Sequence, residues 1–304
     1  MEREYRDKDG NLLTREEVQQ LPPEELSDRS GLLLNILPHT DDLYESIADV
    51  MIETILRKEG EKATMILPVG PTGQYPVFAR RVAEQGIDCR NLWTFNMDEF
   101  LDRNGRTIPQ SHPMSFKCAM MKTFFERIPE GLRMPVEQMF FPRHDNMDEM
   151  DRALDQHAPD GVDLCLAGVG PEGHFAFNED PNFRHVEVSE EEFLSDRTRL
   201  VLVNTSTVDM DALVASCGDR SAIPPFAVTI GPRDVLRAKR TDVVFFAGRF
   251  QRNALRETLF RQPTMRFPGS YLKLRKRPDG RLVPQNLTIW ATPLEAGPVT
   301  TQTI

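Results

Sequence analysis

Short apolar runs alternate with amphipathic helical stretches along most of the chain, and this alternation restricts the fold more than any other feature. Apolar residues recur at helical spacing between residues 43 and 55, Gly60 marks the end of that stretch, and the apolar run ATMIL follows at residues 63–67. This order is typical of βαβ units and a mostly parallel sheet. We therefore predict an α/β protein with a Rossmann-like, mostly parallel sheet of about seven strands and helices on both faces.

The predicted strands are the apolar runs at residues 63–67, 91–95, 163–168, 199–203, 226–230, 242–247 and 287–291. Helical stretches separate several of these runs, among them residues 77–85, 115–128, 147–158 and 250–260. In sheets of this kind, ligands bind beyond the carboxyl ends of the strands. The loops after the first, second, third and sixth runs are therefore the places where chemistry is expected.

Residues 1–40 are predicted to be an N-terminal extension to a single domain at residues 41–304. Thr14 and Glu17 fit the capping box of a short helix, which the prolines of LPPEE at residues 21–25 interrupt. The leucine-rich stretch GLLLNILP at residues 31–38 could pack on the body of the protein or on a neighbouring subunit.

The composition restricts the class of protein and its partners. Hydrophobic residues make up 39% of the chain, which is enough for a sizeable core, and the net charge of −10 argues against binding to nucleic acid or to an anionic membrane. No apolar run approaches the roughly 20 residues of a membrane span, and the charged start of the chain lacks a signal-peptide pattern. The four scattered cysteines lack metal-ligand spacing and fit a reducing compartment. We expect a cytoplasmic protein.

The first candidate loop, PVGPTGQYP at residues 68–76, combines two glycines with a hydroxyl group. Gly70 and Gly73 permit a tight turn, Thr72 offers a hydroxyl, and a predicted helix begins just beyond them. Main-chain N–H groups at such a helix start bind anions. The loop therefore fits phosphate binding, although it fits an ordinary strand-to-helix turn equally well and lacks the lysine of a Walker motif.

The second and third loops carry acids and a histidine. In TFNMDEF, Asp98 and Glu99 follow a strand, and because adjacent side chains point in different directions, at most one should face a pocket; a solvated acidic loop is the alternative. In GVGPEGH the chain turns through Gly168, Gly170 and Gly173 to reach His174. A histidine can transfer protons near neutral pH, and the flanking Glu172 and Glu179 can orient it and tune its basicity.

Cations and metals are the remaining ligand questions. Arg199 in SDRTR and Arg252 in GRFQRNAL could reach an anion at the edge of the sheet, although each alone also fits a surface arginine. Two sets of residues could bind a divalent ion, but neither has established metal-site spacing: His174 with Glu172 and Glu179, and His39 with Asp41 and Asp42. We expect no metal.

Taken together, these segments resemble those of the glucosamine-6-phosphate deaminase (isomerase) family, within the superfamily of sugar-phosphate isomerases and 6-phosphogluconolactonases. The similarity runs through about residues 40–295 and rests on LPVGPTGQYP, TFNMDEF, HPMSF, GVGPEGHFAFNEDP, SDRTR and PPFAVTIG. The lactonases share the pattern GxGPxGH, including Pro171, but continue differently. The continuation AFNED in this chain favours the deaminase branch.

The resemblance implies a role for each residue. Asp98 matches the base that moves a proton between C2 and C1 of the sugar, and His174 matches the ring-opening histidine, supported by Glu172 and Glu179. Gly168 and Gly170, in the matching glycine turn, would also contact the substrate or its phosphate. The phosphate would lie against Gly70, Pro71 and Thr72, near Arg199 and Arg252. The implied reaction converts glucosamine 6-phosphate and water into fructose 6-phosphate and ammonia in amino-sugar catabolism, needs no cofactor, and is expected in a homo-oligomer.

Several residues depart from the family's pattern. Glu172 replaces an aspartate, Pro71 replaces a glycine, and Arg252 replaces a lysine. The family also has an arginine in the phosphate region that has no counterpart between residues 209 and 216 of this chain. Arg220 could substitute for it. Three alternatives therefore stay open: turnover of another phosphosugar such as galactosamine 6-phosphate, 6-phosphogluconolactonase activity, and a regulator that binds a sugar phosphate without turning it over.

Overall fold

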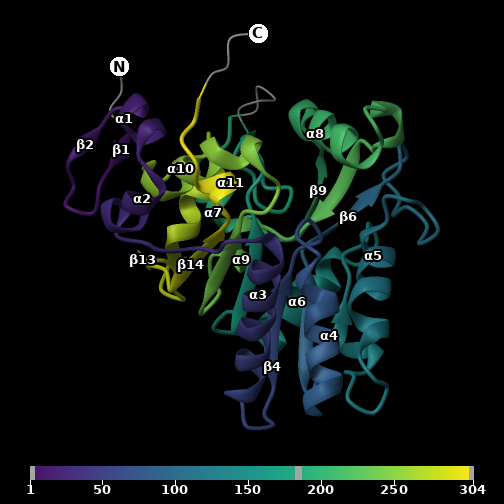
Figure 1. The fold of residues 1–304 in the computed structure, drawn as a ribbon. Helices are drawn as coiled ribbons and strands as arrows, with labels where there is room; N and C mark the ends of the chain where they lie inside the picture. Colours follow the sequence, from purple (N-terminus) through teal and green to yellow (C-terminus); the bar gives the residue numbers. More distant parts are fainter. Residues whose placement is uncertain (1–3, 182–186, 301–304) are drawn as a thin grey trace.

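A computed structural model describes residues 4–181 and 187–300 of the protein. Within these residues, seven parallel strands form the central sheet in the order β3-β14-β11-β8-β4-β5-β7, with helices on both faces (Figure 1). The predicted α/β class is confirmed.

The strands of the described chain are β1 (Tyr5–Arg6), β2 (Leu12–Leu13), β3 (Leu33–Ile36), β4 (Ala63–Leu67), β5 (Leu92–Asn96), β6 (Asp98–Leu101), β7 (Met139–Phe140), β8 (Leu164–Gly168), β9 (Arg199–Leu202), β10 (Phe226–Thr229), β11 (Thr241–Val244), β12 (Leu274–Lys276), β13 (Leu282–Pro284) and β14 (Leu287–Ala291). The α-helices are α1 (Arg15–Gln20), α2 (Pro23–Ser30), α3 (Thr40–Leu56), α4 (Gln74–Gln85), α5 (Phe116–Thr123), α6 (Met147–His157), α7 (Glu190–Ser195), α8 (Thr205–Ala215), α9 (Pro232–Val235), α10 (Arg252–Phe260) and α11 (Pro293–Ala296).

The central sheet is apolar on both faces because each face is covered. In β8, Leu164 and Leu166 join the core that contains the buried residues of α3 and α4, whereas Cys165 and Ala167 join the core that contains those of α6 and α10. Alternate residues of a strand point to opposite faces, so a continuous apolar run is what a doubly covered strand requires.

A second, smaller sheet stands beside the first, with antiparallel strands in the order β6-β10-β9. The runs at residues 199–203 and 226–230 are strands, as predicted, but they belong to this sheet, and β3 and β7 complete the seven-stranded one. The chain leaves β5 at Met97 and continues directly into β6, so the small sheet begins at the carboxyl edge of the large one. Apolar periodicity indicates strands without indicating their partners, which is why their assignment to the central sheet was wrong.

The N-terminal segment packs against the sheet and against α10. Thr14 and Glu17 form the predicted capping box at the start of α1. β3, from the leucine-rich stretch, pairs with β14 and forms one edge of the central sheet. The Tyr5 hydroxyl donates to Glu257 Oε1 on α10 over 2.8 Å. Among the described residues, no helix is both long and apolar enough to cross a membrane.

Candidate active site

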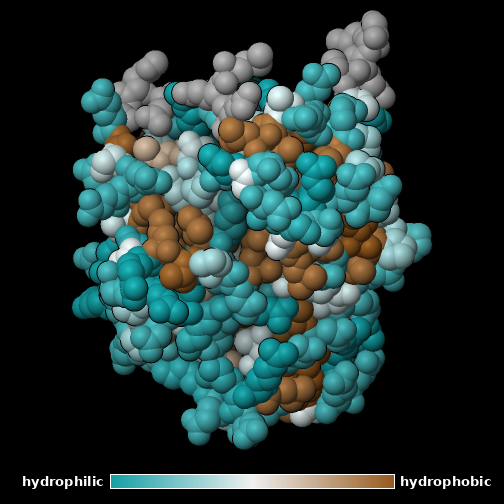
Figure 2. Space-filling view, turned by 90° about the vertical axis from the view of Figure 1, so that its left-hand side faces the viewer, coloured by the Kyte–Doolittle hydropathy of each residue, from teal (hydrophilic) through white to brown (hydrophobic). Residues whose placement is uncertain are grey.

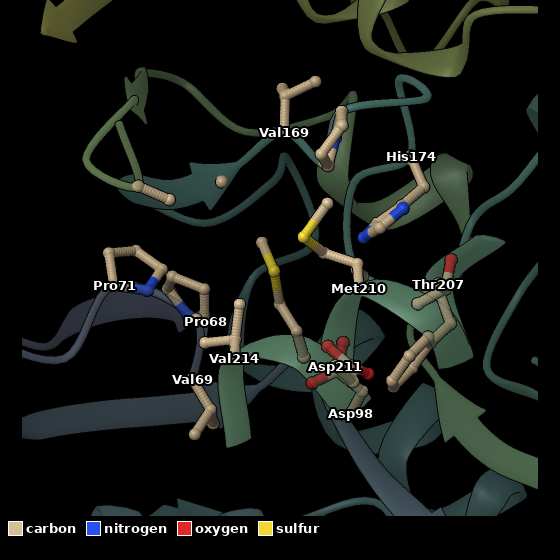
Figure 3. Close-up of a pocket in the computed structure, with 18 of the residues that line it drawn as sticks. Pro68, Val69, Pro71, Asp98, Val169, His174, Thr207, Met210, Asp211 and Val214 are labelled. Atoms are coloured by element: carbon tan, nitrogen blue, oxygen red, sulfur yellow. The ribbon is translucent and has the colours of Figure 1, made fainter. Parts of the chain in front are cut away.

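A cavity of about 250 Å³ opens where the carboxyl ends of β4, β5, β8 and β11 meet, and all four predicted loops contribute to it. Its volume lies near the lower end of protein ligand pockets and suits a ligand the size of a monosaccharide. Figure 3 shows how side chains from these loops and from α8 point into it. The lining residues are Pro68, Val69, Gly70, Pro71, Met97, Asp98, Phe116, Gly168, Val169, Gly170, Pro171, His174, Ala176, Phe177, Thr207, Met210, Asp211, Val214, Phe246, Ala247, Phe250 and Gln251.

The neighbouring acids Asp98 and Glu99 point to different places, as strand alternation predicts. Asp98 lines the cavity, although only 6% of its surface is exposed. Glu99 lies on the other side, where it accepts hydrogen bonds from the main-chain N–H groups of Phe116 and Lys117 at the start of α5 (3.0 and 2.8 Å). Glu99 therefore anchors a helix, and Asp98 is the acid available for chemistry.

Burial makes Asp98 an unusually weak acid. Burial, assisted by the charges of Glu99 and Asp211 and opposed by the positive charge of His174, raises its pKa to about 8. A carboxyl group with a pKa near neutrality can both accept and return a proton at working pH.

His174 is held in place by a glycine turn that leaves no room for a side chain. A Cβ atom at Gly170 would lie 2.2 Å from His174 Cε1, and a Cβ at Gly173, where φ is +98°, would lie 2.3 Å from the ring of Phe267. The Gly170 N–H donates to the carbonyl of His174 over 2.9 Å, which closes the turn. The local sequence GVGPEGH is therefore what allows the imidazole to reach the cavity.

Glu172 pairs with the imidazole of His174. His174 Nδ1 lies 2.8 Å from Glu172 Oε1. Burial disfavours the charge on His174, but the carboxylates of Glu172, Glu179 and Asp211 outweigh it and raise the pKa of the imidazole. Burial alone would raise the pKa of the Glu172 carboxyl group. The charge of His174 and a hydrogen bond from Thr207 outweigh burial and lower that pKa. These opposite pKa shifts favour an imidazolium–carboxylate pair, in which both side chains are partly exposed.

Thr207, at the start of α8, connects the two glutamates and was not predicted. Its Oγ1 lies 2.6 Å from Glu172 Oε1 and 2.6 Å from Glu179 Oε1, and Glu179 also accepts from the main-chain N–H of Asn204. A hydroxyl group carries one proton, so at any moment Thr207 donates to one of the two carboxylates. His174, Glu172, Thr207 and Glu179 are therefore linked by one continuous series of polar contacts.

One face of α8 lines the cavity. Thr207, Met210, Asp211 and Val214 follow the i, i+3, i+4, i+7 spacing of a helix face. The half-buried Asp211 was also missed by the sequence analysis. Leu213, outside this face, is apolar and 70% exposed, and Val214, which lines the cavity, is still 69% exposed, so no amphipathic pattern separates the pocket face from the surface face.

The proposed phosphate residues are divided between the cavity and its surroundings. Gly70, Pro71, Gly168 and Gly170 line the cavity, and α4 begins just beyond the loop that contains Thr72. Gly73 admits no side chain, because a Cβ there would lie 2.1 Å from the ring of Tyr44.

The two predicted arginines do not line this cavity. Arg199 donates to Asn178 Oδ1 over 2.9 Å, pairs with Asp196 at 3.0 Å and lines a neighbouring pocket beside β9. Arg252 Nε donates to the carbonyl of Leu294 over 2.7 Å, and its Nη1 donates to that of Pro298 over 3.0 Å. The described residues that line the main cavity include no lysine or arginine. Arg220, the possible substitute, pairs with Asp209 at 2.5 Å.

The donor atoms of Glu172, His174 and Glu179 lie within 4.8 Å of one another. A divalent ion would therefore find three ligands of suitable type here, but two of the donors already share hydrogen bonds with Thr207 and one is an imidazole with a raised pKa. Such an imidazole favours a proton over a metal, because a ligating histidine must be neutral.

No protein-family model matches the chain. A glucosamine-6-phosphate deaminase of Porphyromonas gingivalis is 30% identical over 234 residues, which cover 74% of this chain and 81% of that protein. A glucosamine-6-phosphate deaminase of Caenorhabditis elegans is 27% identical over 233 residues, covering 74% and 80%.

Solved structures show the same fold. A monomeric glucosamine-6-phosphate deaminase superposes with a TM-score of 0.70 at 22% identity, covering 87% of this chain and 98% of that one. A 6-phosphogluconolactonase of Thermotoga maritima superposes with a TM-score of 0.58 at 18% identity, covering 86% and 99%. The fold is thus shared by both enzyme types, while the sequence relatives carry the deaminase name, and the chain belongs to the glucosamine-6-phosphate deaminase family.

Proposed function

We propose that the protein converts glucosamine 6-phosphate and water into fructose 6-phosphate and ammonia. The observation that carries this proposal is the pairing, in one cavity, of a buried carboxyl group whose pKa is near neutrality with an imidazole held by a carboxylate. Asp98 supplies a proton acceptor and His174 a proton donor, which an aldose–ketose isomerisation requires in turn.

Ring opening is assigned to His174. The C1 hydroxyl loses a proton, the C1–O5 bond breaks, and O5 takes up a proton, which yields the open-chain aldehyde without net proton change. The imidazole can donate to O5 and recover a proton from O1, and Glu172 at 2.8 Å keeps the ring in one orientation during both transfers. The Thr207 hydroxyl contacts both Glu172 and Glu179, and it holds these carboxylates in place beside His174.

Isomerisation is assigned to Asp98. Its carboxylate removes the proton from C2, the electron pair forms the C1–C2 double bond, and O1 is protonated. The same carboxyl group then returns a proton to C1, which leaves a protonated imine at C2. Water adds to this imine and ammonia departs, giving the ketone of fructose 6-phosphate. None of these steps calls for a metal or an organic cofactor.

The phosphate group is proposed to bind the loop at Gly70, Pro71 and Thr72, at the start of α4. The first turn of a helix leaves main-chain N–H groups without intrahelical acceptors, and the helix dipole favours an anion there. A cation is proposed to come from the start of α10 or the turn before it: Arg252, the first residue of α10, bonds to C-terminal carbonyls, and the exposed Arg249 in the turn has no partner within the described part of the chain. Arg199 stays a candidate for a supporting role beside β9.

Two alanine variants test the phosphate proposal. Arg252→Ala or Arg249→Ala should raise KM for the phosphosugar about tenfold or more with little change in kcat, because a remote phosphate contact stabilises ground state and transition state alike. A melting curve separates binding from folding, since Arg252→Ala also removes two hydrogen bonds to the C-terminal segment. Equal turnover of glucosamine and glucosamine 6-phosphate would contradict the proposal.

The function itself is tested by product assays on a panel of phosphosugars. Ammonia release from glucosamine 6-phosphate supports the proposal, and faster release from galactosamine 6-phosphate would assign a different sugar. The lactonase alternative rests on the shared turn that contains Pro171 and on the shared fold, so acid release from 6-phosphogluconolactone belongs in the same panel. Tight binding without turnover of any member would indicate a regulator.

We also propose a cytoplasmic location and assembly into a homo-oligomer. The cysteines Cys89, Cys118, Cys165 and Cys217 are free thiols, which suits the reducing cytoplasm. A homo-oligomer is proposed from the exposed apolar side chains near β3, where Leu33 is 57% exposed at the edge of the central sheet. Figure 2, which views the side carrying the N-terminal segment, shows apolar patches among polar ones. Light scattering that gives a mass near 34.7 kDa would contradict assembly.

A further inference from the structure

Asp211 occupies a position in the cavity that the proposed reaction steps leave unused. It lies on the same face of α8 as Thr207 and projects into the cavity that Asp98 and His174 share (Figure 3). The contacts of Thr207 with Glu172 and Glu179 fix the position of the first turn of α8. The carboxylate of Asp211 is therefore held over the reacting groups by a fixed element.

The charge of Asp211 has no partner in the described chain. No hydrogen bond or ion pair joins its carboxylate to another described residue, and the lining residues include no lysine or arginine. Asp209, two residues earlier on the same helix, pairs with Arg220 at 2.5 Å. The positive charge of His174 acts on Asp211, but His174 is directly paired with Glu172. A half-buried carboxylate without a direct partner is costly, so the cavity favours a further cation beside Asp211.

The position of Asp211 places it near the substituent on C2 of the proposed substrate. Asp98 is the proposed base at C2, so a bound sugar must place C2, and with it the C2 amino group, beside Asp98. Asp211 is near enough for its charge to raise the pKa of Asp98. A C2 amino group beside Asp98 would therefore also lie near the carboxylate of Asp211, and as an ammonium it would give that carboxylate a direct cationic partner.

We propose that Asp211 binds the protonated C2 amino group of the substrate and thereby selects an amino sugar over the sugar with a hydroxyl group at C2. The inference rests on the proposed function and names the residue behind its substrate preference. Burial and the carboxylates of Glu172 and Glu179 raise the pKa of Asp211 to about 6 while His174 opposes them, so the group is charged at neutral pH.

The experiment compares two ligands that differ only at C2. KM and kcat are measured for glucosamine 6-phosphate, and the competitive inhibition constant is measured for glucose 6-phosphate, in the wild type, in Asp211→Asn and in Asp209→Asn. Asp211→Asn keeps the shape and removes the charge. It should raise KM for the amino sugar about 10- to 100-fold, while the inhibition constant of glucose 6-phosphate changes less than about threefold or falls. Asp209→Asn, on the outer side, should change neither.

A merely structural role would weaken both ligands together, so an equal loss for the amino and the hydroxyl sugar in Asp211→Asn overturns the inference. Unchanged constants for both ligands overturn it as well. Failure of the proposed function is a separate outcome. If the wild type releases no ammonia, calorimetry with the same two ligands still decides: tighter wild-type binding of the amino sugar, lost in Asp211→Asn, supports the role of Asp211, and equal affinities refute it.

Discussion

At the scale of single residues, the environment of Asp98 favours proton transfer at the expense of stability. The pKa of its carboxyl group is about 8 in the folded protein and 3.8 in the unfolded reference. The folded state therefore holds a proton that the unfolded state has released, and the stability associated with Asp98 is fully present below pH 3.8 and is lost as the pH rises through 8.

Asp98→Asn should therefore be both inactive and more stable. Turnover should fall at least about 100-fold, because a general base contributes about 10²–10⁴-fold. The melting temperature of the variant should exceed that of the wild type by about 2 °C or more at pH 8, and the difference should grow from pH 4 to pH 8 and then level off. In the wild type, kcat/KM should rise with pH to a midpoint near 8, since only the ionised carboxylate accepts the C2 proton. A variant that keeps a tenth of the activity would exclude Asp98 as the base.

Thr207 provides a second residue-scale prediction, because its hydroxyl is the bridge between Glu172 and Glu179. Thr207→Val removes the hydroxyl and keeps the volume, and it should lower kcat/KM about tenfold or more by leaving two carboxylates to repel each other. Thr207→Ser retains the hydroxyl and should stay within about threefold of the wild type. The pH dependence of kcat/KM distinguishes a hydrogen-bonding role of Thr207 from a packing role, because only the loss of the hydroxyl should displace the limb set by His174. Equal losses in the two variants would show that the methyl group is what matters.

The site residues differ in how far a sequence can reveal them. Asp98 and Glu99 could be separated in advance, because alternation along a strand sends neighbours to opposite sides. His174 and Glu172 are two residues apart in a glycine turn, so their contact is local. Thr207 and Asp211 lie on α8, which is distant in sequence from Asp98 and His174. The orientation of α8 depends on tertiary contacts, and these leave no local pattern in the sequence. The arginines show the reverse: Arg199 and Arg252 are near the site in sequence, but their hydrogen bonds hold them beside other elements.

At the scale of elements, the turn between β8 and His174 depends on backbone shape more than on side chains. Gly170→Ala should lower kcat/KM about 100-fold or more, because the new methyl group would lie 2.2 Å from the imidazole and force it from the cavity. Gly131→Ala is the matched control, since a Cβ there meets nothing within 4 Å. Activity and the melting temperature are both measured. The fall in melting temperature should be too small to explain the loss of activity. A fully active Gly170→Ala would show that the histidine does not need its present position.

A helix or strand could be predicted from the sequence where its own residues carry a regular apolar pattern. The run at residues 63–67 is β4 and the helical spacing from residue 43 to 55 is part of α3, because both patterns reflect a buried face. The membership of the two sheets was not predictable in this way. β9 and β10 have the composition of core strands. A single residue, Met97, separates β6 from β5, and β9 and β10 form an antiparallel sheet with β6 instead of joining the central sheet.

At the scale of the whole molecule, one buried arginine joins the two ends of the described chain. Arg256 on α10 is fully buried. Its Nε donates to the carbonyl of Val18, and its Nη2 donates to those of Leu21 and Ala296, over 3.1, 2.8 and 2.9 Å. Burial lowers the pKa of its guanidinium to about 10, and the charge of Arg252 adds to this effect. A planar donor is well suited to this task, because a single group must reach three carbonyls in different directions.

Arg256→Met should destabilise the protein and release its N-terminal segment first. Methionine keeps the apolar stem but leaves three buried carbonyls without a donor, and each such loss costs about 1–3 kcal/mol. The melting temperature should fall by about 4 °C or more, and Arg256→Lys should rescue little, since one ammonium cannot span the three acceptors. Hydrogen exchange should quicken in α1 and α2 before it does in β4 or β8, because those strands lie in the two cores and do not depend on the arginine. Arg103→Met, at an exposed arginine without a described partner, controls for the loss of a positive charge. A variant whose α1 exchanges no faster than in the wild type would show that packing of Val18 and Leu21 holds the segment, and that the arginine only fills the space between the two ends.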